Sequence, residues 1–149
     1  MEPSFPAVWS RVTGATPGED ERAMLRRWHR EAAEARQFYS VVSQRAGSPA
    51  ARETLRSIGT EEERQLRRLA ALYYLRTGEH LSPLPAEIVP IRPLLTVLRE
   101  RYRQALERAA DYRQAAEHVP EDTAELALSL AKEERDHARA LLGLAERLL

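Results

Sequence analysis

The chain contains no cysteine among its 149 residues. This absence excludes disulfides, thiolate zinc sites, cysteine-held iron–sulfur clusters and thiol chemistry. Any metal must therefore be held by carboxylate, imidazole, amide or phenol groups. An excess of one charge is also missing, because Lys+Arg and Asp+Glu both number 23. A net charge of zero gives no electrostatic reason to expect nucleic acid or an anionic membrane as a partner.

Long apolar runs are absent as well. No stretch is long and apolar enough to cross a bilayer, and the first residues lack the apolar centre of a signal peptide. We therefore expect a soluble, cytoplasmic protein that does not act at a membrane. The length of 149 residues predicts a single domain that is large enough to bury a core.

Glycine and proline divide the chain into four long segments with helical periodicity. After a lead-in over residues 1–16, the predicted helices span residues 17–46, 49–77, 93–118 and 120–149. Thr16 and Ser48 are N-cap candidates, each followed by proline, while Gly47 and Gly78 mark helix ends. Prolines exclude a helix in the crossover at residues 78–92, which is long enough to run the length of a bundle. The pattern predicts an all-α, four-helix up-down bundle.

The last predicted helix carries the clearest functional pattern. Its inward stripe is Leu130, Glu134, His137, Leu141 and Leu144, at steps of four, three, four and three. Three leucines indicate that this stripe faces a core, yet a carboxylate and an imidazole lie at its centre. A buried, ionised carboxylate needs a cation, an arginine or water as its partner. Glu-x-x-His on an inward face is one way for a helix to offer two ligands to a metal.

The second predicted helix has a related interruption. Its inward stripe is Leu55, Ile58, Glu62, Gln65, Leu69 and Leu72. Here the polar pair has the form Glu-x-x-Gln. A weak internal repeat links the two halves, because Tyr39 precedes Glu62 by 23 residues and Tyr112 precedes Glu134 by 22. Two equivalent helical hairpins that face one another would bring Glu62 and Glu134 together at the centre of the bundle.

Three segments resemble the ferritin-like superfamily, and rubrerythrin-like proteins in particular. They are AEARQFY (33–39), IGTEEERQLRRL (58–69) and LAKEERDHARAL (130–141). The resemblance covers about residues 19–149 and implies a ferritin-like four-helix bundle with a long crossover between its second and third helices. A rubrerythrin in the full sense also carries a cysteine-rich rubredoxin module, which this chain cannot form.

The resemblance also implies a ligand set. The family's di-iron site takes a glutamate from each of helices one and three, and Glu-x-x-His from helices two and four. Glu134 and His137 match the fourth helix and Glu62 matches the second, whereas Gln65 occupies the position of the other histidine.

The match departs from the family at two further positions. The first-helix glutamate corresponds to Ala32, with Glu31 one residue away, and the third-helix glutamate corresponds to Ala105. A register one residue later, which aligns EERQL (62–66) with EERDH (133–137), would select Glu63 and Leu66 in the second helix. The apolar stripe favours the first register.

The first functional hypothesis is a rubrerythrin-like metal carboxylate protein, which would make it a metal-dependent oxidoreductase. It would use iron or manganese for oxygen or peroxide chemistry, with zinc as a further possibility. The candidate ligands are Glu62, Glu134 and His137, joined by Glu31 or Gln65. Because only three of these are strong ligands, a single ion or a weak site is expected.

Two alternatives remain open at this point. An arginine such as Arg36, Arg64 or Arg108 could hold the buried acid, which would leave a catalytically silent bundle with a structural or interaction role. A small molecule could instead bind in the bundle interior, where four alanines leave room: Ala32, Ala35, Ala105 and Ala109.

Related bundles often dimerise through helix faces, so a homodimer is also an expectation. Glu61 and His29 lie off the stripes and are interpreted as surface residues.

Overall fold

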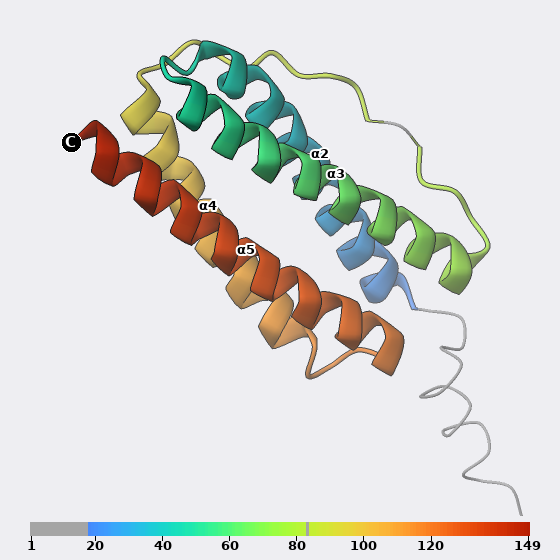
Figure 1. Ribbon diagram of the computed structural model, residues 1–149. Helices are drawn as coiled ribbons and strands as arrows, with labels where there is room; N and C mark the ends of the chain where they lie inside the picture. Colours follow the sequence, from blue (N-terminus) through green and yellow to red (C-terminus); the bar gives the residue numbers. More distant parts are fainter. Residues whose placement is uncertain (1–17, 83) are drawn as a thin grey trace, which may run out of the picture.

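The computed structural model describes residues 18–82 and 84–149 of the chain (Figure 1). Its helices are α2 (Glu19–Arg45), α3 (Pro49–Thr77), α4 (Leu94–Ala115) and α5 (Glu121–Leu148). No strand occurs within the described ranges, so the predicted all-α, four-helix fold is confirmed. The predicted lead-in, with its capping residue Thr16, lies outside the described residues.

The four helices form two antiparallel hairpins, α2–α3 and α4–α5, that pack side by side (Figure 1). The segment between α3 and α4 returns along the length of the bundle, so these two helices run in the same direction. Side chains of α2 hold this crossover. Gln37 accepts a hydrogen bond from the backbone N–H of Glu87 at 2.9 Å, and Arg45 donates to the carbonyl of Pro90 at 3.2 Å.

The ends of α3 follow the local rules that the sequence indicated. The Ser48 side chain accepts a hydrogen bond from the N–H of Ala51 at 3.1 Å, and a proline follows Ser48 directly. Gly78 closes the helix with φ of 75°, a left-handed conformation that favours glycine. The start of α2 differs, because its N-cap is Gly18, which provides no side-chain hydrogen bond.

Two apolar clusters form the core, with a polar layer between them along α3 and α5. The first cluster includes Ala35, Phe38, Tyr39, Val42, Leu55, Ile58, Leu98, Leu141 and Leu144. The second includes Leu25, Trp28, Ala32, Leu69, Tyr73, Tyr112, Ala127 and Leu130. The buried polar residues between them on α3 and α5 are Glu62, Gln65, Glu134 and His137. Burial of the apolar side chains stabilises the bundle and keeps water away from this layer.

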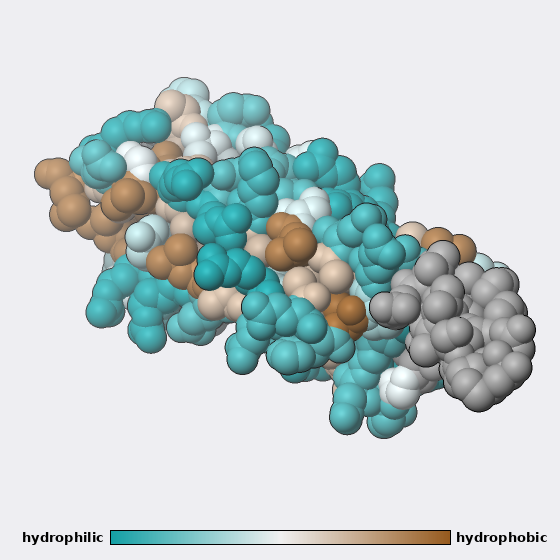
Figure 2. All heavy atoms as spheres, turned by 90° about the horizontal axis from the view of Figure 1, so that it is seen from below, coloured by the Kyte–Doolittle hydropathy of each residue, from teal (hydrophilic) through white to brown (hydrophobic). Residues whose placement is uncertain are grey.

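The surface carries scattered apolar side chains among charged ones. The face in Figure 2 is mostly hydrophilic, with separate hydrophobic groups. Leu106, Leu128 and Leu142 are each between 42% and 51% exposed. Isolated leucines of this kind are common on monomers, and the homodimer stays a prediction. No helix in the described ranges is long and apolar enough to span a membrane.

Gly59 permits close packing of α3 against α2. A Cβ atom at this position would lie 3.2 Å from the Cβ of Tyr39, which is closer than ordinary van der Waals contact. Gly143 on α5 offers a contrast, because a Cβ there would meet only the end of the Arg147 side chain, at 3.8 Å. The absence of a side chain at Gly59 therefore sets how closely the first hairpin can pack beside the polar layer.

We predict that Gly143→Ala stabilises the protein by up to about 1 kcal/mol, the gain in helix propensity when alanine replaces glycine. Gly59→Ala should gain less or lose stability, since its methyl group must push Tyr39 away. Urea unfolding of both variants, followed by circular dichroism, measures the difference. Equal gains at the two sites would show that the helices do not approach closely at Gly59.

Candidate metal centre

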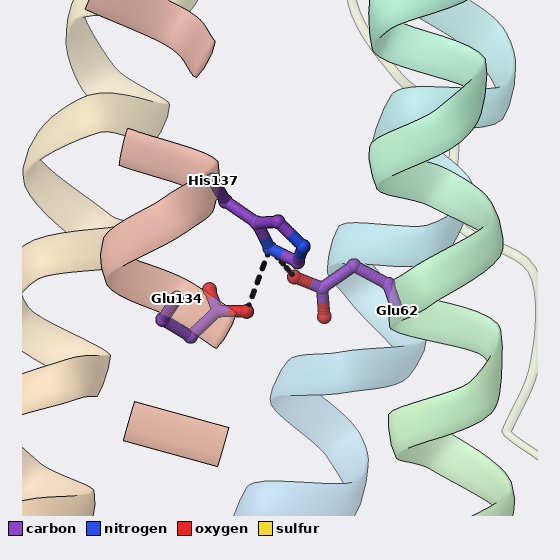
Figure 3. Close-up of side chains that lie close together, drawn as sticks. All are labelled: Glu62, Glu134 and His137. Carbon is purple, nitrogen blue, oxygen red and sulfur yellow. Dashed lines mark ion pairs between the residues drawn. The ribbon is translucent and has the colours of Figure 1, made fainter. Parts of the chain in front are cut away.

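Three potential ligands meet at the centre of the bundle. Figure 3 shows Glu62 reaching from α3 toward Glu134 and His137, which both come from α5. One ligand atom of each residue lies within 4.8 Å of those of the other two, and all three side chains are buried. Of the two glutamates that the alternative registers selected, Glu62 is the one that lies beside Glu134 and His137. Glu63 instead forms an ion pair with Arg36 at 2.8 Å on the outer side.

The two ring nitrogens of His137 have different surroundings. Nδ1 lies 2.9 Å from Oε2 of Glu134 and 3.2 Å from Oε2 of Glu62, but no hydrogen bond to either is well aligned. Nε2 lies 3.2 Å from Oε1 of Glu61. A carboxylate at one ring nitrogen is the usual support for a histidine that binds metal through the other. Glu61 was interpreted as a surface residue; its side chain is 35% exposed, and it also contacts His137.

Arg108 of α4 contacts the same two carboxylates. Its Nη1 lies 3.1 Å from each carboxylate oxygen of Glu62 and 3.0 Å from Oε1 of Glu134. Its Nη2 donates to the hydroxyl of Tyr112 at 3.1 Å and to Oε1 of Gln65 at 3.3 Å. The arginine partner that the sequence allowed as an alternative to a metal is therefore present.

Burial and charge act against each other throughout this cluster. Burial raises the pKa of Glu62, and the attraction of Arg108 offsets only part of this effect. Burial also opposes ionisation of Glu134, but Arg108 and His137 outweigh it and lower the pKa of that carboxyl. Burial disfavours a charged His137, yet contacts with Glu134 and Glu62 raise its pKa to about 10. The imidazolium and guanidinium thus balance the two carboxylates in the metal-free protein.

The remaining predicted ligands have other positions. Gln65 donates from Nε2 to Oε2 of Glu134 at 3.0 Å, so it supports a ligand through a hydrogen bond. Glu31 is half-buried on α2 and lies outside the three-residue group; its Oε1 has no hydrogen-bond partner, and burial raises its pKa. Ala32 and Ala105 are buried without any ligating atom. The ligand set of a two-metal site is therefore incomplete.

Sequence reasoning did not single out Arg108 from the three arginines it considered. Arg36 contacts Glu63, and Arg64 approaches Glu133 only to 4.0 Å. No signal in the sequence separates these arginines, because Arg36 follows the inward Ala35 just as Arg108 precedes the inward Ala109. His29 was interpreted as a surface residue, but it is buried.

Comparisons with known proteins support the fold only. No protein-family model matches the chain, and no curated protein matches it. Among solved structures, the chain is similar to "Hypothetical Protein Pfu-1136390-001" from Pyrococcus furiosus. The TM-score is 0.70 and the sequence identity is 22%, over 84% of this chain and 87% of that chain. At this identity the likeness supports the four-helix arrangement and transfers no function.

We predict that Arg108→Met destabilises the metal-free protein by about 3–5 kcal/mol, because it leaves two buried carboxylates with too little positive charge. Urea unfolding in the presence of EDTA measures the loss. Arg56→Met is the matched control, since Arg56 pairs with Glu53 where both side chains are more than 60% exposed, and it should cost less than about 1 kcal/mol. Similar losses in both variants would contradict a central role for Arg108.

The raised pKa of His137 predicts a pH dependence with a defined sign. Folding raises this pKa from 6.5 to about 10. The stabilising effect of protonated His137 is therefore complete below pH 6.5 and is lost as the pH rises toward 10. The free energy of unfolding of the metal-free protein should therefore fall over this window. His137→Gln should remove most of the slope in parallel urea titrations. A slope that survives this substitution would assign the effect to another group.

Proposed function

We propose that the protein binds a single transition-metal ion, iron or manganese, through Glu62, Glu134 and His137. The observation that carries the proposal is the position of His137 Nδ1. This buried atom lies within 3.2 Å of two carboxylate oxygens and has no aligned hydrogen bond. Two carboxylates and one imidazole suit iron and manganese, and zinc also accepts such ligands.

The surroundings of His137 add support. Glu61 can accept the Nε2 hydrogen of the ring, which fixes the ring orientation and leaves the Nδ1 lone pair for a metal. A groove of about 500 Å³ between α3 and α5 is lined by residues that include Glu61, Asp136 and His137. In our proposal, an ion approaches the imidazole through this groove, past two acidic side chains.

The resemblance of the sequence to rubrerythrin-like proteins extends the proposal to oxygen or peroxide chemistry. Iron or manganese would supply the redox capacity in such a reaction. Three protein ligands leave coordination positions for water or a small oxidant. The residues of the chain would bind the ion, orient the imidazole and keep bulk solvent away from the ion. Burial raises the pKa of both Tyr39 and Tyr112, so these nearby hydroxyls remain protonated.

A catalytically silent bundle is the second candidate, and one observation favours it. Arg108 already compensates both carboxylates, so the polar layer can be closed without a metal. In that case the cluster would align the two hairpins and serve a structural or interaction role. Small-molecule binding has no comparable support, because the alanines that suggested it are packed in the core: Ala32, Ala35, Ala105 and Ala109.

We predict that protein purified after growth with iron and manganese contains about one equivalent of metal, and that Glu134→Ala removes it, because the ion loses one of its two carboxylates. Glu125→Ala is the control, since it removes an exposed carboxylate from the same helix and should retain the metal. Elemental analysis of the three proteins measures the content. Metal-free wild-type protein under these conditions would favour the silent bundle.

A further inference from the structure

The two buried carboxylates each lie between two positively charged groups. Glu134 directs Oε2 to Nδ1 of His137 at 2.9 Å and Oε1 to Nη1 of Arg108 at 3.0 Å. Glu62 also contacts both groups. Its Oε2 lies 3.2 Å from Nδ1 of His137, and both of its carboxylate oxygens lie 3.1 Å from Nη1 of Arg108. Both carboxylates therefore bridge two cation positions, one beside His137 and one that holds the guanidinium of Arg108.

Neighbouring side chains hold Arg108 in its position. Its Nη2 donates to the Tyr112 hydroxyl and to Oε1 of Gln65, and its side chain is only 10% exposed. Gln65 also donates from Nε2 to Glu134. An amide can accept from the guanidinium and donate to the carboxylate at once. Gln65 therefore uses its carbonyl oxygen to accept from the guanidinium and its amide nitrogen to donate to the carboxylate.

Two buried alanines contribute no ligand atom to the cluster. Ala105 lies one turn before Arg108 on α4, and it is buried at 3% exposure. Ala32 on α2 is fully buried. Neither residue offers a ligand atom to an ion in the second position. Glu31 of α2 lines a pocket with Arg108, but it lies outside the group of Glu62, Glu134 and His137. The guanidinium therefore supplies the positive charge at the second position.

We propose that Arg108 permanently occupies the second of two cation positions, limits the cluster to one metal ion beside His137, and competes with that ion for Glu62 and Glu134. This inference rests on the proposed function and specifies its stoichiometry. A fixed guanidinium repels an ion bound to the same carboxylates, and this repulsion is strong in a buried site. Loss of its charge should therefore tighten metal binding.

The test is a calorimetric titration of Mn²⁺ into four metal-free proteins. Wild type should bind one ion, and Arg108→Gln should bind Mn²⁺ about tenfold or more tightly than wild type because the competing charge is gone. Gln65→His combined with Arg108→Gln should bind two ions, since the second position then gains an imidazole. Arg103→Gln removes an exposed charge from the same helix and should leave the affinity unchanged.

The outcomes separate this inference from the proposed function. Two ions in wild type would overturn the inference and leave the metal site intact. No ion in wild type, with one in Arg108→Gln, would reject the proposed function for the natural chain and support competition by Arg108. Folded Arg108→Gln with wild-type affinity would overturn the inference.

A second variant covers the case in which Arg108→Gln does not fold. Tyr112→Phe removes the hydroxyl that accepts from Nη2 and retains the aromatic ring in the core. A less firmly held guanidinium should compete less well, so the variant should bind Mn²⁺ severalfold more tightly than wild type. An unchanged affinity would overturn the inference.

Discussion

Compensation of two buried carboxylates is the constraint on which the bundle depends. Glu62 and Glu134 are at most 1% exposed, so their charges cannot be solvated by bulk water. Arg108 from α4 and His137 from α5 supply the positive charge. Since Glu62 belongs to the first hairpin and the other three residues belong to the second, these contacts also fix how the hairpins face one another.

The same atoms can form a closed salt-bridge layer or a metal site, and the position of His137 supports our proposal of a metal site. A layer that served packing alone would be expected to aim the Nδ1 hydrogen at one carboxylate oxygen. Instead Nδ1 lies between two oxygens without an aligned hydrogen bond, while Glu61 contacts the other ring nitrogen. This geometry resembles a metal-binding histidine with its supporting carboxylate. In our proposal, Arg108 limits such a site to one ion.

Much of the fold was predictable because the relevant signals are local. Glycines and prolines mark the helix ends, and the apolar period identifies the inward faces. The pairing of Glu62 with Glu134 followed from the interruptions of two apolar stripes and from the internal repeat. The selection of Arg108 and the contact of Glu61 with His137 were not predictable, because they depend on helix rotation and on the path of long side chains across an interface. The resemblance to the ferritin-like superfamily suggested Glu31 as a further ligand, but Glu31 lies outside the group of Glu62, Glu134 and His137.

The central claim is that His137 Nδ1 and the two carboxylates form one cation site. Anomalous diffraction from a crystal grown with Mn²⁺ tests it most directly, because the manganese edge locates the ion without reference to activity. The account predicts a single anomalous peak within bonding distance of Nδ1 and of one oxygen from each of Glu62 and Glu134. A fully resolved centre with no peak, or with manganese bound only at surface carboxylates, would contradict it.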